Sequence, residues 1–377
     1  MTIVGTAIDP TRAPKAVDSR RVAIVHYWLV GMRGGERVVE RLLKLFPNAD
    51  IFTHVYDPAK TSAQINAVQV KTTFINGLPL SRRFYQYYLP LMPMALEQLD
   101  LTGYDLIISS ESGPAKGVIT DPDALHVCYC HSPMRYLWDH YHLYRKDANP
   151  LARAAMPWIY HRMRQWDFSS SGRVDRFAAN SQFVQSRIRK NWRRESEVIH
   201  PPVDTGLFIP SLDIDDAYLW VGQMVPYKRP DLVVEAFNAT GLPLLMVGDG
   251  AMSKRLKAIA KPNIRFADRL DFDALRRAYS RARALVFTAE EDFGMVPVEA
   301  MASGRPVLAF GNGGVKDSIV PERTGLFFAQ QSAESLIDGI ERMEAWLPHF
   351  DPGEAIAQAR LFAPEIFDAK IMQLVQP

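Results

Sequence analysis

Short apolar stretches alternate along the chain with longer stretches in which apolar residues recur at helical spacing. The apolar stretches have no polar face, which is typical of parallel strands covered by helices on both sides. Strands are predicted at Val22–His26, Leu106–Ser109, Leu125–Cys130, Arg176–Ala179, Tyr218–Val221, Pro243–Val247, Ile264–Phe266, Ala284–Phe287 and Pro306–Ala309. Helices are predicted at Glu36–Leu45, Pro230–Phe237, Met252–Ala260, Phe272–Ser280, Val296–Ser303, Ala333–Trp346 and Pro364–Leu374. This alternation predicts a doubly wound α/β architecture.

Both halves of the chain begin with a strand, a loop and a helix. Val22–His26 leads into the glycine-containing loop Gly31–Gly35, and Tyr218–Val221 leads into a loop that contains Lys228. Prolines stiffen the segment 200–204 between the halves, because proline fixes its own φ and restrains the preceding residue. We therefore expect a flexible extension at 1–20, Rossmann-like domains at 21–202 and 203–360, and a C-terminal helix at 361–377 that could pack back on the first domain.

Composition narrows the class of protein without assigning a function. The 377 residues suffice for two domains, and 47% apolar with 23% charged residues is typical of a soluble globular enzyme. The formal net charge of +2 gives no field over the whole chain that would attract nucleic acid. Cys128 and Cys130 lie too close together in the chain to form a disulfide that stabilises a domain, so a reducing, cytoplasmic compartment is expected. We expect no membrane span and no secretory leader, because apolar runs are short and residues 1–20 lack an apolar core.

Two glutamates with seven residues between them carry the clearest chemical signal. Glu291 follows a predicted strand, and Glu299 falls in the first turn of the next predicted helix. Phe293, Gly294 and Met295 then lie at the helix N-terminus, where free amides and the helix dipole attract an anion. Carboxylates beside a bound anion suit sugar hydroxyls better than phosphate, so the motif predicts a nucleotide-sugar site at the strand ends. Acids that only complement the helix dipole are the alternative.

The span from Glu291 to Glu299 resembles the E-x7-E motif of retaining glycosyltransferases with the GT-B fold, in which two Rossmann-like domains face each other across a cleft. The resemblance covers about residues 20–375 and is closest to bacterial GDP-mannose-dependent α-mannosyltransferases of exopolysaccharide and O-antigen assembly. Further segments agree in order, namely Ala179–Val184, Val198–Asp204, Val247–Gly250, Met301–Val307 and Arg323–Leu326. The likeness to mannosyltransferases in particular rests on Gly34–Arg37, Cys130–Asp139 and Val225–Asp231.

The resemblance implies roles for the residues around the two glutamates. Glu299 would bind the ribose of the donor, and Glu291 would contact the donor sugar as a catalytic residue. The diphosphate or sugar hydroxyls would be held by four backbone amides at the helix start, those of Phe293, Gly294, Met295 and Val296.

Lys228 matches the lysine that neutralises the donor diphosphate, and it is the second catalytic candidate. The arginine usual five positions earlier is replaced by Gln223, which can hydrogen-bond phosphate but adds no charge. Either Lys228 alone neutralises most of the diphosphate charge, or Arg229 or Arg269 supplies the missing positive charge. A solvated loop lysine is the alternative for Lys228. The resemblance implies no metal and no cofactor.

Candidates in the first domain have weaker support. Gly34 and Gly35 open a predicted helix whose amides could face the donor phosphates, with a ligand-free turn as the alternative. His131 follows a predicted strand, and the resemblance implies that it contacts the donor sugar as a third catalytic candidate. His26 is a candidate on the acceptor side. Zinc is not expected, because ligands crowded on one strand cannot easily converge on a metal, as would be required of His126, Cys128, Cys130 and His131.

Basic and aromatic residues mix in two stretches of the first domain. One stretch holds the candidate membrane contacts Arg82, Arg83, Phe84 and Tyr85. The other, residues 151–197, has ten basic and four acidic residues, a local charge of +6. Such mixtures predict docking on an anionic membrane surface. A solvated helix face with core aromatics is the alternative, and no nucleic-acid motif accompanies either stretch.

The residues and the resemblance together predict a retaining, metal-independent hexosyltransferase. It would move mannose from GDP-mannose to a hydroxyl of a lipid-linked, polyprenyl diphosphate oligosaccharide in bacterial polysaccharide synthesis. It would work in the cytoplasm as a peripheral protein on the inner face of the cytoplasmic membrane. The alternatives are another donor such as UDP-glucose, a nucleotide-sugar epimerase of the same fold, and a noncatalytic protein that binds sugar or a lipid surface.

Overall fold

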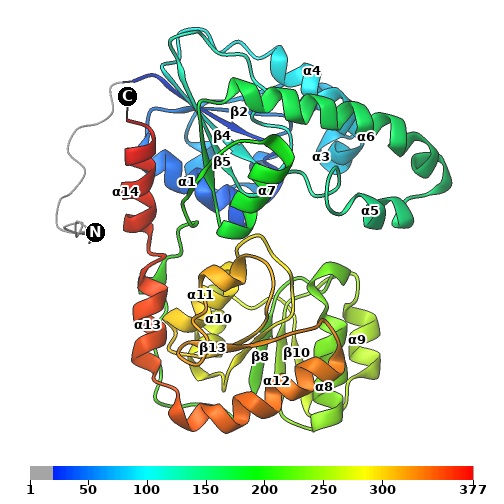
Figure 1. Cartoon of the computed structure of the whole chain (residues 1–377), viewed down its shortest axis with the longest axis vertical. Coiled ribbons are helices and arrows are strands. Elements are labelled where there is room, and N and C mark those ends of the chain that lie inside the picture. The colour runs from blue at the N-terminus through cyan, green and yellow to red at the C-terminus, as the bar shows by residue number, and fades with distance from the viewer. Residues whose placement is uncertain (1–19, 377) are drawn as a thin grey trace. The chain divides into compact units, whose positions relative to one another are not determined.

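The computed structural model describes residues 20–376, so nearly all of the predicted extension at 1–20 lies outside the described residues. The described chain forms two compact units (Figure 1). Unit 1 contains residues 20–178, 191–196 and 368–376, and unit 2 contains residues 179–190 and 197–367. The predicted domain boundary at 202–203 therefore lies within unit 2, and the last residues of the described chain belong to unit 1.

The first sheet has seven strands, in the order β3-β2-β1-β4-β5-β6-β7. Strand β1 pairs in parallel with β2 and with β4, and the pairs β2–β3 and β4–β5 are also parallel. All five residues of β1 are buried, which is why its sequence has no polar face. The strands are β1 (Val22–His26), β2 (Asp50–Thr53), β3 (Val70–Thr72), β4 (Leu106–Glu111), β5 (Leu125–Cys130), β6 (Arg176–Ala179) and β7 (Glu197–Val198).

The helices of the first half differ in length and in apolar pattern. Helix α1 buries Val38, Val39, Leu42 and Leu43, which recur at helical spacing. On the C-terminal segment of unit 1, Asp368 accepts a hydrogen bond of 2.7 Å from Nε of Arg41 on α1. The helices are α1 (Gly34–Leu45), α2 (Ala63–Asn66), α3 (Ser81–Phe84), α4 (Met92–Glu97), α5 (Tyr141–Asp147), α6 (Pro150–Ser170), α7 (Gln182–Trp192) and the last helix of the chain, α14 (Pro364–Leu374).

The second sheet has six strands, in the order β10-β9-β8-β11-β12-β13, and all its pairings are parallel. Its strands are β8 (Tyr218–Val221), β9 (Leu244–Val247), β10 (Ile264–Ala267), β11 (Leu285–Phe287), β12 (Val307–Phe310) and β13 (Gly325–Phe328). Its helices are α8 (Pro230–Thr240), α9 (Ser253–Ile259), α10 (Phe272–Arg281), α11 (Met295–Ala302), α12 (Ala333–Trp346) and α13 (Pro352–Arg360).

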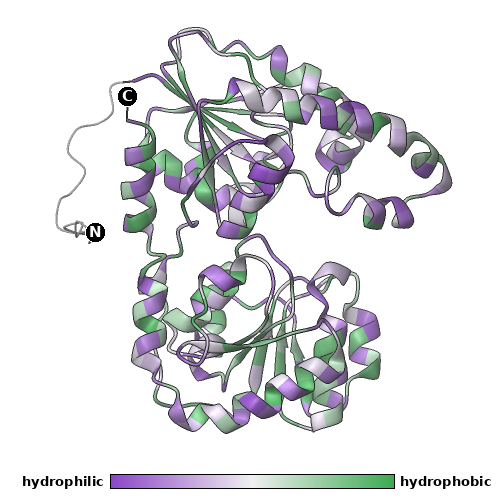
Figure 2. Ribbon diagram, in the orientation of Figure 1, coloured by the Kyte–Doolittle hydropathy of each residue, from purple (hydrophilic) through white to green (hydrophobic). Residues whose placement is uncertain are grey.

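Helices cover both faces of the second sheet. Leu219 and Leu285 belong to one apolar cluster, with side chains of α10, α11 and α13. Tyr218 and Trp220 belong to another cluster, with side chains of α8, α9 and α12. Neighbouring residues of β8 thus point to opposite faces, as a strand requires. Figure 1 shows the two groups of helices on opposite sides of the strands, and Figure 2 shows how apolar these strands are.

The predicted doubly wound α/β architecture is confirmed in both sheets. In each sheet the first strand, β1 or β8, lies between the second and the fourth strand in chain order, so the order reverses beside it. Ligands of such sheets bind beyond the carboxyl ends of the strands at this reversal. All nine predicted strands are present. The pattern did not predict β2, β3, β7 and β13, which are two to four residues long. It also did not predict α2, α3, α4, α5, α7 and α13, or the long helix α6, which contains Pro157.

Candidate functional site

A lysine and a glutamate from two loops meet at the carboxyl ends of β8 and β11 in unit 2. Nζ of Lys228 lies 2.7 Å from Oε1 of Glu291, and both side chains are largely buried. Burial lowers the pKa of Lys228, but the charge of Glu291 outweighs it, so this pKa is raised and the amine stays protonated. An ammonium has three N–H donors, so Lys228 can bind phosphate oxygens while it holds Glu291.

Neighbouring loops fix the backbone around Lys228. Lys228 ends a short 3-10 helix, and Arg229 then turns the chain with a φ of 52° before α8 begins. Oγ1 of Thr288, directly after β11, donates to the carbonyl oxygen of Lys228 at 2.7 Å. Nε2 of Gln331 donates in turn to the carbonyl oxygen of Thr288 at 2.8 Å. Sequence reasoning missed Thr288 and Gln331, since neither stands in a recognisable motif.

Helix α11 begins directly after the Glu291 loop. Gly294 is its N-cap, with a φ of 86° and a ψ of 84°, a left-handed conformation that favours glycine. A Cβ at Gly294 would also lie 3.2 Å from the ring of the phenylalanine that ends β11. Met295 and Val296 are the first helical residues, and their amides have no acceptor within the helix. The helix start therefore offers donors and partial positive charge to an anion, whereas the side chain of Phe293 is buried in the core.

Two glycines of the loop after β12 support the Glu291 loop. The amide of Gly314 donates to the carbonyl oxygen of Glu291 at 2.9 Å. Gly313 has a φ of 86°, and a Cβ there would lie 2.5 Å from the same oxygen. A Cβ at Gly314 would lie 2.0 Å from the carbonyl oxygen of Asp292. Neither position has room for a side chain, so the two loops pack backbone against backbone.

Glu299 is anchored by a buried tyrosine. It is the fifth residue of α11, at the start of the second turn and not in the predicted first turn. Its Oε2 accepts a hydrogen bond of 2.7 Å from Oη of Tyr279 on α10, and Tyr279 is fully buried. A carboxylate has lone pairs for further hydrogen bonds, so Glu299 can also accept from a vicinal diol. No local pattern identified Tyr279, which stands 20 residues earlier in the chain.

Arg229 and Arg269, the two bases proposed to supply the positive charge that Gln223 lacks, differ in their contacts. Gln223 is exposed in the loop after β8. Nη2 of Arg229 lies 3.0 Å from Oδ2 of Asp231, so this guanidinium is already paired. Arg269 is exposed in the loop after β10. Of the cations considered, it is Lys228 that the structure brings to Glu291.

A second polar cluster lies in unit 1 at the carboxyl ends of β1, β4 and β5. Nδ1 of His26 lies 3.0 Å from Oγ of Ser110, and the same hydroxyl lies 2.8 Å from Nε2 of His131. Nε2 of His26 lies 3.9 Å from Oε1 of Glu36. His26, Ser110 and Glu36 are buried, whereas His131 is partly exposed. The two predicted histidines therefore share one hydroxyl, a link that the sequence did not reveal.

Gly34 and Gly35 are the first two residues of α1. The amide of Arg33, the N-cap, donates to Oε2 of Glu36 at 2.9 Å and so closes the start of the helix. A Cβ at Gly35 would lie 2.5 Å from Oη of Tyr27, which gives this glycine a packing role. A role for the two glycines at the donor phosphates stays a prediction.

The cysteines of β5 belong to the protein core. Cys128 and Cys130 are both buried, and burial raises the pKa of the Cys128 thiol. His126 on the same strand is engaged by Oγ of Ser109 at 2.9 Å and by the carbonyl oxygen of Arg173 at 3.1 Å. Within residues 20–376, no three His, Cys, Asp or Glu side chains are grouped so as to hold a metal ion.

The candidate membrane contacts lie on and beside α3. Arg82, Arg83 and Phe84 are exposed. The ring of Tyr85 instead packs 4.7 Å from the ring of Trp28, so most of this side chain faces the protein. Three of the four candidate membrane contacts are therefore exposed to solvent and accessible to a membrane surface.

Further apolar side chains are exposed near these arginines. Leu80 and Tyr87, on either side of α3, are 68% and 77% exposed. Leu89 and Met92, which follow in the chain, join Met163 of α6 in one buried apolar cluster. None of the helices in the described part of the chain is both long and apolar enough to cross a bilayer.

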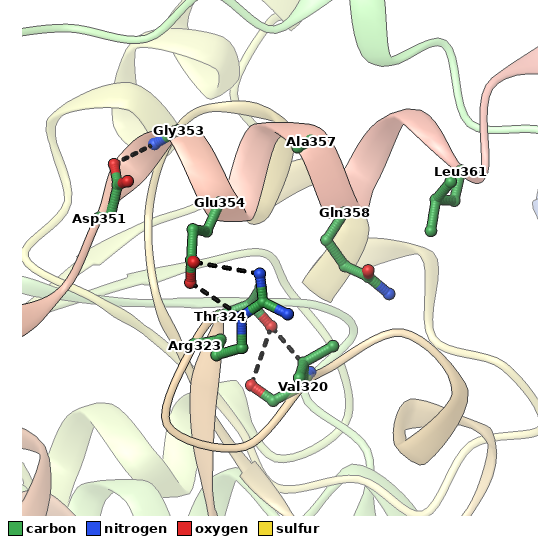
Figure 3. A pocket seen from close by; sticks show the side chains of 9 residues that line it. All are labelled: Val320, Arg323, Thr324, Asp351, Gly353, Glu354, Ala357, Gln358 and Leu361. Atoms are coloured by element: carbon green, nitrogen blue, oxygen red, sulfur yellow. Dashed lines mark hydrogen bonds and ion pairs between the residues drawn. The ribbon is translucent and has the colours of Figure 1, made fainter.

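A surface pocket of about 380 Å³ lies elsewhere in unit 2 (Figure 3). Arg323 and Glu354 form a bidentate ion pair in the wall of this pocket. Nη2 of Arg323 lies 3.0 Å from Oε1 of Glu354, and Nε lies 3.1 Å from Oε2. Its lining residues are Val320, Arg323, Thr324, Asp351, Gly353, Glu354, Ala357, Gln358 and Leu361. None of the predicted site residues is among them, so this pocket is separate from the Lys228–Glu291 pair.

Two family models match the chain and together cover most of it. The model described as Glycosyltransferase Family 4 matches residues 32–207, and the model described as Glycosyl transferases group 1 matches residues 212–345. The second match includes Lys228, Glu291 and Glu299.

Individual proteins match over different shares of the chain. An uncharacterised glycosyltransferase of Methanocaldococcus jannaschii is 26% identical over 44% of this chain and 48% of its own length. A GDP-mannose-dependent alpha-mannosyltransferase of Mycobacterium tuberculosis is 37% identical over 28% of each chain. The chain thus spans less than half the length of these curated relatives. The crystal structure of HepE from Anabaena with UDP and glucose shares the fold, with a TM-score of 0.70 at 16% identity over 94% of this chain and 98% of HepE.

Proposed function

The chain belongs to the group 1 glycosyltransferases with the GT-B architecture, and from this we propose that it is a retaining α-mannosyltransferase that uses GDP-mannose. The acceptor is a hydroxyl of an oligosaccharide on polyprenyl diphosphate, in bacterial polysaccharide synthesis. The observation that carries the proposal is the largely buried Lys228–Glu291 pair at the strand reversal of unit 2, beside the start of α11.

The geometry of unit 2 suits the departure of a nucleoside diphosphate. Negative charge builds up on the diphosphate as the bond to the sugar breaks, and fixed positive groups lower the barrier. Lys228 supplies a permanent charge, because Glu291 keeps its pKa raised. The amides at the start of α11 supply further donors. Glu299, held by Tyr279, grips the ribose hydroxyls and so fixes the nucleotide.

GDP-mannose is the preferred donor because of the 37% identity to a GDP-mannose-dependent enzyme and the mannosyltransferase-like segments. UDP-glucose is the second candidate, since HepE was solved with UDP and glucose. A panel of nucleotide sugars, each with and without a lipid-linked acceptor, tests both. We expect the release of GDP from GDP-mannose only when the acceptor is present, and an α-linked product in the NMR spectrum.

Other results of this panel would contradict the proposal. Faster turnover of UDP-glucose would overturn the donor assignment. Conversion of a donor into its epimer without nucleotide release would indicate the epimerase. Tight donor binding with no turnover of any sugar would indicate a binding protein.

The protein is proposed to work at the inner face of the cytoplasmic membrane, through the surface around α3. Arg82→Ser combined with Arg83→Ser is expected to weaken binding to phosphatidylglycerol vesicles about tenfold or more at low salt, since each surface cation contributes about 1 kcal/mol. The difference should shrink at high salt, because salt screens exposed charges. Sedimentation of the protein with vesicles measures the bound fraction of the parent and of the double variant at each salt concentration.

The matched control removes the same charge from unit 2. Lys254 and Arg255 are exposed on α9, and Lys254→Ser with Arg255→Ser should leave vesicle binding unchanged. Equal losses in both double variants would show a general charge effect, and no loss in either would remove the docking surface.

A further inference from the structure

Four polar side chains of unit 1 form a continuous chain from the core to a partly exposed histidine. Oε1 of Glu36 lies 3.9 Å from Nε2 of His26, and Nδ1 of His26 lies 3.0 Å from Oγ of Ser110. Oγ of Ser110 lies 2.8 Å from Nε2 of His131. The first three residues are at most 2% exposed, so water does not compete for these contacts.

When the His26 ring holds a single proton, the carboxylate of Glu36 decides which nitrogen carries it. Nε2 of His26 is buried and has no hydrogen-bond partner among the described residues, and the nearest charged atom is Oε1 of Glu36. A lone pair on Nε2 would face the carboxylate and be repelled, whereas an N–H there is attracted. Burial raises the pKa of Glu36. The contact with His26 and the hydrogen bonds from backbone amides lower this pKa by a larger amount, so Glu36 is ionised.

The direction of the remaining hydrogen bonds follows from this choice. With the proton on Nε2, Nδ1 of His26 can only accept, so Ser110 donates to it. The Ser110 oxygen then accepts a hydrogen bond from Nε2–H of His131. A neutral imidazole carries one N–H, so Nδ1 of His131 keeps its lone pair.

His131 is neutral because its surroundings shield it, although part of its surface is exposed. Burial lowers the pKa of His131 to about 3. Among residues 20–376, nothing is hydrogen-bonded to Nδ1 of His131. This nitrogen is therefore a hydrogen-bond acceptor without a partner in the described part of the chain.

We propose that Glu36, acting through His26 and Ser110, holds His131 as the Nε2–H tautomer, so that Nδ1 accepts a hydrogen bond from a ligand hydroxyl. Glu36, His26 and Ser110 are positioning residues in this scheme. The assignment of the hydroxyl to a sugar rests on the proposed function, whereas the tautomer does not.

The tautomer can be read directly from long-range ¹H–¹⁵N spectra of the full chain with labelled histidines, at alkaline pH and without substrate. Two buried histidines of unit 1 serve as internal references. His54 donates from Nε2 to the carbonyl oxygen of Pro114 at 3.1 Å, and His126 donates from Nδ1 to that of Arg173 at 3.1 Å. We expect the His131 signals to match the His54 pattern. A match to the His126 pattern would overturn the proposal.

The variant Glu36→Gln separates the charge of Glu36 from its role at the helix start. Glutamine keeps an oxygen for the amide of Arg33, so the fold should persist, and unchanged His54 and His126 signals would report this. The ratio of Nε2–H to Nδ1–H at His131 should fall about tenfold, because the nearby charge is gone. Glu40→Gln, one turn further along α1, should change nothing.

An unchanged ratio in Glu36→Gln would also overturn the proposal, whatever the enzymatic activity. If instead the tautomer shifts as expected but no nucleotide sugar is turned over, the proposed function fails and the positioning of His131 stands.

Discussion

Replacement of Lys228 by methionine is expected to lower the turnover number about 100- to 1,000-fold, the usual loss when one electrostatic donor to a transition state is removed. The reason is that Lys228 is the protonated side chain beside Glu291, and the charge of Glu291 raises the pKa of the amine, so it keeps its positive charge. Because diphosphate binding also uses this charge, the KM for the donor should rise, although less than the turnover number falls. Steady-state kinetics with the preferred donor measure both.

A second lysine of unit 2 provides a matched control. Nζ of Lys257 lies 2.7 Å from Oδ1 of Asp268, the same separation as in the Lys228–Glu291 pair, but both side chains are exposed. Lys257→Met therefore removes an equivalent ion pair from another place and should leave the kinetics unchanged. If Lys228→Met retained turnover within about threefold of the parent, its cation would have no part in stabilising the leaving group.

Replacement of Glu299 by alanine is expected to raise the dissociation constant for the nucleoside diphosphate about 10- to 100-fold, since hydrogen bonds to a charged group contribute about 1.5–3 kcal/mol. The carboxylate is held in place by Tyr279, so little ordering is needed when the ribose binds. Calorimetric titration of GDP and UDP measures the loss. Glu235→Ala, which removes an exposed acid from α8, should bind as the parent does.

The ribose itself gives a sharper test of Glu299. The parent should bind a 2′-deoxynucleoside diphosphate more weakly than the ribonucleotide, and Glu299→Ala should bind both equally. If the parent does not distinguish the two sugars, Glu299 has another role. Tyr279→Phe should give an intermediate loss, because it removes one hydrogen bond from the carboxylate without removing the carboxylate itself.

Much of the fold could be predicted because parallel strands covered on both faces have no polar face. The buried strand Val22–His26 and the helix Ala333–Trp346 were found at their observed bounds. The short strands β2 and β13 were missed, although β6 and β8 of the same length were found, because they begin with aspartate and glycine, which are uncommon in strands. Helix α6 was missed because Pro157 in its interior is normally a sign of a helix end.

The candidate site was predictable where its residues stand in a recognisable stretch of sequence. Glu291, Gly294 and Glu299 lie on one loop and helix, so their spacing carried the signal. Tyr279 and Gln331 reach the same region only through the packing of separate elements, and no local pattern reports such contacts. The histidines at 26 and 131 were each predicted, but their shared hydroxyl depends on the order of the strands.

The first unit is completed by the last stretch of the polypeptide. Asp368 accepts from Arg41, and the carbonyl oxygen of Leu374 accepts from Arg176 at 2.8 Å. A gene fragment that stops at codon 202 would leave both arginines without these acceptors. Recombination that exchanges the second half as a cassette must therefore use two crossovers and spare the final codons if both contacts are to be kept.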